Sequence, residues 1–167
     1  MYYKFCPKCA SDLTEVDHNG QSVPQCTSCG FFFYQNSKPT ASALILDGDK
    51  ILLGKHAIEP FKGMWDILGG YLYFGEHPSA GVKREILEET GLQIGITDML
   101  GFFMDTYGEY DQTLNICYVA KIVGGQPVAG DDVAELRWFN ISEPPKEFAF
   151  KNSYEMFGAL RRYLSNK

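Results

Sequence analysis

Residues 70–92 read GYLYFGEHPSAGVKREILEETGL, and the second half of this stretch has the composition of a helix. Pro78 suits the first helical position, where no backbone N–H is needed, and Gly91 provides a common stop. We therefore predict a helix over residues 78–90. Its buried side would be formed by Val82, Ile86 and Leu87.

Three glutamates of this helix, Glu85, Glu88 and Glu89, lie three and four positions apart, so their carboxylates share one face. Three neighbouring anions repel one another unless a cation neutralises them. Carboxylate oxygens without a histidine or cysteine suit Mg²⁺ or Mn²⁺. A solvated acidic helix face is the alternative interpretation of the same residues.

The spacing of the whole stretch is more specific than the three glutamates alone. It follows the pattern G-x5-E-x7-R-E-U-x-E-E-x-G-U, in which U is aliphatic. The defined positions are Gly70, Glu76, Arg84, Glu85, Ile86, Glu88, Glu89, Gly91 and Leu92. This is the pattern of the Nudix box, and the chain therefore resembles the Nudix hydrolases.

Turn signals and apolar runs predict strands on both sides of this helix. These strands cover residues 40–46, 50–54, 70–74, 92–107, 113–122 and 133–139. Two prolines then break the chain before an amphipathic helix over residues 153–164. The order of strands, helix, strands and helix indicates an α+β or layered αβα fold. The resemblance implies a Nudix αβα sandwich with a mixed sheet, preceded by a small zinc ribbon.

Four of the five cysteines form two pairs in the pattern C-x2-C-x16-C-x2-C. They are Cys6, Cys9, Cys26 and Cys29. Each tight pair can aim two sulfurs at one ion, and four thiolates form the tetrahedral set that a structural zinc prefers. With all four positions filled, no place is left for a water. Cys117 stands alone in an apolar run, and we expect a small buried hydrophobe there.

The cysteine pairs lie in an N-terminal segment that turn-rich residues separate from the rest of the chain. We expect a zinc ribbon over residues 1–36 and a Nudix hydrolase domain over residues 37–167. The aromatic run at residues 31–34 allows two interpretations. We favour a strand that packs against the second domain, and the alternative is a platform on which bases stack.

The resemblance extends beyond the helix. The cysteine ribbon, Tyr34-Gln35-Asn36, Gly63-Met64-Trp65 and Phe148-Ala149-Phe150 are similar to the zinc-ribbon subgroup of Nudix enzymes. That subgroup includes bacterial NADH pyrophosphatases and plant FAD/ADP-ribose pyrophosphatases, of which the plant enzymes are nearer. The signature segment of the NADH enzymes is absent after the helix.

The resemblance also implies a role for each residue of the box. The ligands of a catalytic Mg²⁺ or Mn²⁺ would be Glu85, Glu88, Glu89 and the carbonyl of Gly70. Arg84 would pair with Glu76 and orient the loop. Family members cleave a nucleoside diphosphate linked to a moiety X into a nucleoside monophosphate and X-phosphate. The subgroup implies ADP-ribose, FAD or an NADH-like dinucleotide as the substrate.

The acid that accepts a proton from the attacking water is left open. Asp132 stands where relatives often have a helper glutamate, and a solvated loop acid is the alternative reading of this shorter side chain. Glu109 and Asp111 are its rivals. Rings that could stack on a base, or else belong to the core, are Trp65, Tyr71, Tyr73, Phe74, Phe103 and Tyr107.

Composition limits the class of protein. The chain has 167 residues, 45% hydrophobic and 22% charged, with a net charge of −6. This is a globular composition, and the acidic balance disfavours binding to nucleic acid. Without an apolar run of membrane length or a signal-peptide pattern, we expect a cytoplasmic protein without a membrane partner.

Two alternatives to catalysis stay open at this point. One is a non-catalytic Nudix module that senses a nucleotide. The other is nucleic-acid binding through the ribbon, although residues 1–34 contain only two lysines and no arginine. The intact box favours the enzyme. A homodimer also stays open.

Overall fold

The computed structural model describes residues 3–107 and 111–167. In chain order the elements are β1 (Leu13–His18), β2 (Gln21–Cys26), β3 (Lys38–Asp47), β4 (Lys50–His56), β5 (Trp65–Asp66), β6 (Leu68–Tyr71), α1 (Pro78–Thr90), β7 (Leu92–Tyr107), β8 (Asp111–Gly125), β9 (Val133–Asn140) and α2 (Asn152–Ser165). The strands and helices predicted after residue 39 are present, except that the strand predicted over residues 70–74 lies instead at Leu68–Tyr71. The strands β1, β2 and β5 are additions to that prediction.

Within the described residues, seven strands form one mixed sheet in the order β5-β4-β3-β8-β7. β6 pairs with β3, and β9 pairs with β4. The central pair β3 and β8 is parallel, whereas the other pairs are antiparallel. The predicted mixed sheet is therefore confirmed.

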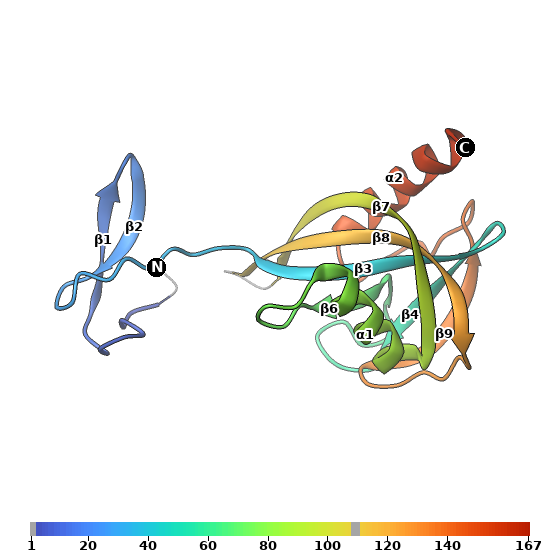
Figure 1. Cartoon of the computed structure of the whole chain (residues 1–167), viewed down its shortest axis with the longest axis horizontal. Helices are drawn as coiled ribbons and strands as arrows, with labels where there is room; N and C mark the ends of the chain where they lie inside the picture. Colours follow the sequence, from blue (N-terminus) through green and yellow to red (C-terminus); the bar gives the residue numbers. More distant parts are fainter. Residues whose placement is uncertain (1–2, 108–110) are drawn as a thin grey trace.

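The two helices cover opposite faces of this sheet (Figure 1). Alternate side chains of β3 point to opposite faces, as the pleat of a strand requires. Ala43 and Ile45 pack with Ile86 of α1, while Leu44 packs with Leu160 of α2. These two apolar layers make the domain the expected αβα sandwich. Cys117 is fully buried in the α2 layer, as predicted.

Helix α1 begins and ends where its sequence predicts. Pro78 stands in its first turn, and the side chain of His77 accepts a hydrogen bond from the N–H of Ser79. At the other end, Gly91 has φ +67° and its N–H donates to the carbonyl of Leu87. Local capping thus fixes both ends of the helix that bears the three glutamates.

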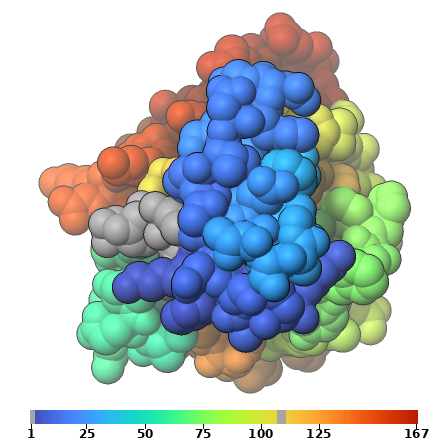
Figure 2. All heavy atoms as spheres, turned by 90° about the vertical axis from the view of Figure 1, so that its left-hand side faces the viewer, coloured from blue at the N-terminus to red at the C-terminus, as the bar shows by residue number. Residues whose placement is uncertain are grey.

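The cysteine ribbon lies at one end of the molecule, at the left of Figure 1. Its hairpin β1–β2 is antiparallel, and an extended segment leads from it into β3. Seen from that side, the ribbon stands in front of the sandwich (Figure 2).

The prediction that residues 31–34 form a strand against the second domain is wrong. Phe31 and Phe33 instead pack on Cys6, Leu13 and Cys26 inside the ribbon. A segment this small has few apolar residues, so it uses neighbouring rings to cover its own cysteines. Phe32 lies against His18, with ring centroids 4.5 Å apart.

The packing of α2 can be tested at Leu160, which is completely buried between the helix and the sheet. We expect Leu160→Ala to lower the free energy of unfolding by about 2–5 kcal/mol, because it leaves a cavity in that layer. Urea unfolding followed by circular dichroism measures the loss. Leu164→Ala, on the same helix but 38% exposed, is the control. Equal losses in the two variants would contradict the described packing.

Candidate functional site

Two glycines bring the end of β6 close to β3 and to α1. Gly69 has φ +140°, and a Cβ there would lie 2.2 Å from the carbonyl oxygen of Ala41. A Cβ on Gly70 would lie 2.7 Å from the carboxylate of Glu85. Only glycine permits both approaches. As a result, the backbone of β6 lies directly against the acidic face of α1.

Arg84 holds the acidic side chains around this loop. Its Nε and Nη2 donate to the two carboxylate oxygens of Glu76, at 2.9 and 2.8 Å. Its Nη1 donates to Glu85 at 2.7 Å and to Glu88 at 3.0 Å. Its guanidinium also stacks on Tyr73, 3.8 Å from the ring centre. The expected ion pair between Arg84 and Glu76 is present, and the same cation also reaches two glutamates of α1.

The three glutamates differ in exposure. Glu88 has 44% of its side chain exposed, whereas Glu85 is largely covered and Glu89 is buried. Oε2 of Glu89 accepts a hydrogen bond of 3.0 Å from the N–H of Gly69. Burial, reinforced by the charges of Asp132 and Glu85, raises the pKa of Glu89 well above its ordinary value. Burial also raises the pKa of Glu85. Ionisation of these two carboxylates therefore costs free energy, and a bound cation would offset that cost.

Among the other predicted acids, Asp132 lies near Glu89, whose pKa it raises. Both residues line the same cavity. Asp111 instead forms an ion pair with Lys38 at 2.7 Å and lines a separate hollow beside the ribbon. Glu109 lies outside the described residues. Of the three predicted bases, the structure brings Asp132 to the acidic cluster.

The cavity beside Glu89 has a volume of about 250 Å³. Its lining includes Gly69, Gly70 and Asp132, and also polar side chains of β3 and β8 and the first turn of α2. None of the described residues that line it is a lysine or an arginine. An anionic ligand in this cavity would meet acidic walls, so it needs cations of its own or a bound metal.

Most of the predicted stacking rings lie elsewhere. Tyr71 lines the cavity, but Trp65 packs on Phe139, Tyr73 stacks on Arg84 and Phe103 belongs to the α2 layer. Phe74 is fully exposed.

Besides Tyr71, the described rings that line the cavity are those of His56, Phe61 and Phe150, which were not predicted to face a ligand. They come from the end of β4, from the loop after it and from the segment before α2, and no periodic pattern marks them. For Phe150, the sequence signal was the segment Phe148-Ala149-Phe150, which is similar to the zinc-ribbon subgroup.

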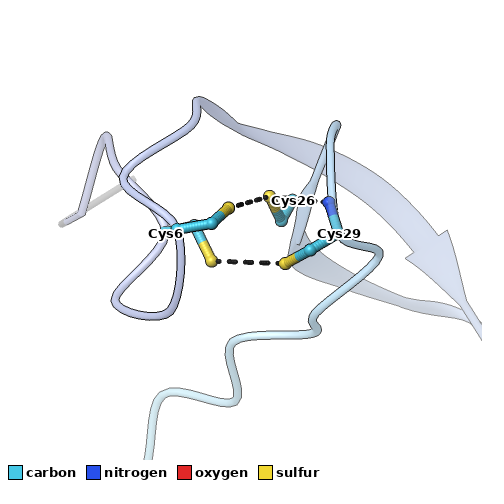
Figure 3. A group of neighbouring side chains, drawn as sticks. Cys6, Cys26 and Cys29 are labelled. Carbon is cyan, nitrogen blue, oxygen red and sulfur yellow. Dashed lines mark hydrogen bonds between the residues drawn. The ribbon is translucent and has the colours of Figure 1, made fainter.

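The four paired cysteines gather into one cluster. Their sulfurs all lie within 4.8 Å of one another. The sulfur of Cys6 lies 3.7 Å from that of Cys29, and the sulfur of Cys9 lies 3.5 Å from that of Cys26. Figure 3 shows the side chains of Cys6, Cys26 and Cys29 pointing toward one another. Such a group could hold a metal ion.

The family model of the NUDIX domain matches residues 36–159, which contain the box, the sheet and most of α2. The chain belongs to the Nudix family. It is thereby a member of a family of hydrolases.

Two curated relatives are informative. The ADP-ribose pyrophosphatase of Methanocaldococcus jannaschii is 32% identical over 114 residues, which cover 68% of each chain. The NAD-capped RNA hydrolase NudC of Pseudomonas aeruginosa is 27% identical over 143 residues, which cover 85% of this chain and 49% of NudC. The Nudix chain described here thus spans about half the length of the NudC protein that it matches.

Among solved structures, a NUDIX hydrolase from Nitrosomonas europaea has a TM-score of 0.80 and 25% identity. The match covers 99% of this chain and 92% of that one, so it includes the ribbon segment. In the described part of the Nudix chain, no helix is long and apolar enough to cross a membrane.

The pair of Glu76 with Arg84 predicts a defined acid sensitivity. Arg84 lowers the pKa of Glu76 from its ordinary value of 4.5 to about 2. A carboxyl with a lowered folded pKa stabilises the fold above its unfolded pKa, and this contribution is lost as the pH falls through the folded pKa. The contribution of Glu76 is therefore complete above about pH 4.5 and disappears toward pH 2.

In Glu76→Gln we expect a lower melting temperature at neutral pH and a smaller fall between pH 4.5 and pH 2 than in the wild type. Melting curves across this pH range measure the difference. Glu143→Gln, at an exposed position after β9, is the control. Parallel curves for the wild type and Glu76→Gln would show that the pair does not stabilise the loop.

Proposed function

We propose that this Nudix protein is a divalent-metal-dependent pyrophosphohydrolase. Its substrate is a nucleoside diphosphate linked to X, and its products are a nucleoside monophosphate and X-phosphate. The observation that supports this most directly is the acidic cluster around Glu89, which opens onto a cavity whose described lining contains no lysine or arginine. A pyrophosphate can bind among such walls only if cations accompany it.

The residues present fit Mg²⁺ or Mn²⁺. They offer carboxylate oxygens and a backbone carbonyl, which are the donors that these ions prefer, and no thiolate or imidazole. We assign the metal to Glu85, Glu88, Glu89 and the carbonyl of Gly70. The raised pKa values of Glu85 and Glu89 agree with this, because ligand carboxylates that repel one another gain most from a bound cation. When bound, the metal would neutralise the pyrophosphate charge and lower the pKa of a ligated water.

Residues of the chain would supply positioning and proton transfer. Arg84 holds Glu85 and Glu88 in place while Glu76 fixes the guanidinium from the loop side. The N–H of Gly69 orients the carboxylate of Glu89. Asp132, which faces the same cavity as Glu89, is the acid that we propose as acceptor of the proton from the attacking water.

The substrate class rests on the relatives. We infer ADP-ribose or an NAD-related dinucleotide, with FAD as a further member of the same class, because the matched proteins are named as an ADP-ribose pyrophosphatase and as NAD-capped RNA hydrolases. Formation of the two monophosphate products from ADP-ribose, NADH, FAD and an NAD-capped RNA, each with Mg²⁺ and with Mn²⁺, tests this. Binding without turnover of any of them would favour the nucleotide-sensing alternative.

We assign the metal of the cysteine cluster as a structural Zn²⁺ held by Cys6, Cys9, Cys26 and Cys29. We also propose that residues 1–36 form a ribbon domain and residues 37–167 the catalytic domain. The support is chemical: four soft sulfur donors close together suit zinc, and their complete set leaves no position for a reacting water.

Substitution of Glu89 tests the proposed metal site. Glu89→Gln keeps the volume and removes the charge, and we expect kcat to fall by at least about two orders of magnitude. The unfolding midpoint should stay or rise, because a buried carboxylate is removed. Mn²⁺ binding followed by electron paramagnetic resonance should weaken in parallel. Glu143→Gln is the control, and near-normal kcat in Glu89→Gln would refute the assignment.

Substitution of Cys26 tests the proposed ribbon. We expect Cys26→Ser to lose its zinc, measured by metal analysis, and to expose residues 3–34 to proteolysis, because the segment has little core of its own. Mg²⁺-dependent hydrolysis should be reduced but not abolished. Cys117→Ser, outside the cluster, should keep its zinc. Complete loss of hydrolysis in a folded Cys26→Ser protein would mean that the ribbon contributes to the active site.

A further inference from the structure

One part of the cavity has no role in the proposed metal chemistry. His56 at the end of β4, Asp66 in β5, Phe61 between them and Phe150 before α2 come together there. The rings of Phe61 and Phe150 have centroids 4.6 Å apart, and each lies about 6 Å from the ring of His56. We call this group the aromatic recess. It offers ring surfaces and one buried carboxyl group to whatever enters.

The carboxyl group of Asp66 is held rigidly in place. Its Oδ1 accepts a hydrogen bond of 2.8 Å from the N–H of Ile67 and a second one from the hydroxyl of Ser153 in α2. Both groups are donors and therefore favour the carboxylate form. Burial opposes this and raises the pKa of Asp66. Rigid placement by two elements is what a side chain needs to discriminate between ligands.

The second oxygen of Asp66 has a different environment. Among the described residues, Nε2 of His56 lies 3.9 Å from Oδ2, which is too long for a direct hydrogen bond. In the described chain, every fully buried side-chain oxygen or nitrogen has a hydrogen-bond partner. Because Oδ2 has no such partner, it is not fully buried, and it is reached from the cavity that Asp66 lines. It is an acceptor that a ligand can fill.

The part of the cavity lining formed by β3 and β8 adds a hydrogen-bond donor. The hydroxyl of Ser42 donates to Oδ1 of Asn115 at 2.7 Å, which leaves the amide Nδ2 of Asn115 for other acceptors. Both residues line the cavity. The lining therefore combines ring faces with an acceptor and a donor. A flat heterocycle whose edge has an N–H donor beside an acceptor matches this combination.

We propose that the aromatic recess binds the heterocycle of the substrate and that Oδ2 of Asp66 accepts a hydrogen bond from an exocyclic amino or carboxamide N–H of that ring. This rests on the proposed function and adds a specificity-determining residue to it. Adenine and nicotinamide share the required chemistry, since each has an NH₂ group next to an acceptor. Unsubstituted purine and nicotinic acid lack that NH₂ group and have no other N–H on the same edge.

Binding of reaction products tests the proposal without turnover. Calorimetric titration of the full chain in Mg²⁺ compares AMP with purine riboside 5′-monophosphate, and nicotinamide mononucleotide with nicotinic acid mononucleotide. We expect the amino member of at least one pair to bind about tenfold more tightly, because its analogue leaves Oδ2 without a donor. The pair that shows the difference identifies the heterocycle. Equal affinities within both pairs would overturn the proposal.

Asp66→Asn separates recognition from support of the fold. The amide of asparagine can present a donor in place of the acceptor, so the preference within the pair should fall to about twofold or reverse. A purely structural role would weaken all four nucleotides equally and leave the ratio unchanged. An unchanged ratio in a folded Asp66→Asn protein would therefore overturn the proposal.

The rings provide a second test, which also applies if Asp66→Asn does not fold. Ribose 5-phosphate lacks the heterocycle and serves as the reference ligand. In Phe150→Leu we expect the advantage of the preferred nucleotide over ribose 5-phosphate to shrink about tenfold, through loss of stacking. Phe102→Leu, at an exposed position on β7, is the matched control. An advantage that persists in Phe150→Leu would count against the recess.

A separate measurement of ADP-ribose hydrolysis distinguishes the proposed hydrolase activity from the proposed binding of the heterocycle in the aromatic recess. Turnover without discrimination in either pair would leave the proposed function intact and refute the recess. Discrimination without turnover would support the recess as a nucleotide site and refute the pyrophosphohydrolase.

Discussion

Repulsion among the acids around α1 is the constraint on which the rest of the site depends. Burial raises the pKa of both Glu85 and Glu89, and the neighbouring charges add to it, those of Glu88 at Glu85 and those of Asp132 and Glu85 at Glu89. Arg84 offsets part of this, but its guanidinium is divided between Glu76 and two glutamates of the helix. Because the described lining of the cavity contains no further lysine or arginine, the remaining charge has to be balanced from outside the chain. The proposed metal and its pyrophosphate substrate would do so together.

The same constraint explains the backbone around the helix. A carboxylate as buried as Glu89 needs a donor nearby, and the N–H of Gly69 is that donor. It can reach Glu89 because Gly69 and Gly70 let β6 approach both β3 and α1 more closely than any side chain would permit. Strand pairing, helix packing and electrostatics are therefore satisfied at one place, and a change to any of them affects the other two.

Local signals account for what the sequence predicts well. Helix α1 has Pro78 at its start and Gly91 at its end, so its limits and its acidic face follow from neighbours in the chain. Residues 31–34 show the opposite case. Their rings could cover either the ribbon or the sandwich, and only the full fold shows that Phe31 and Phe33 pack on the cysteines. The short strand β5 and the recess depend on contacts between distant residues, such as Asp66 with Ser153 in α2, which no local pattern indicates.

This difference has a consequence for function. The groups proposed for metal binding belong to β6 and α1 and are almost contiguous in sequence, so a motif can define them. The recess is built from the end of β4 and the loop after it, from β5 and from the segment before α2. The sheet, rather than proximity in sequence, brings these segments together. Substitutions there can alter which heterocycle fits without disturbing the acids of α1. The proposed pyrophosphate chemistry and the proposed choice of heterocycle thus rest on separate parts of one cavity, and a shared box alone does not determine the substrate.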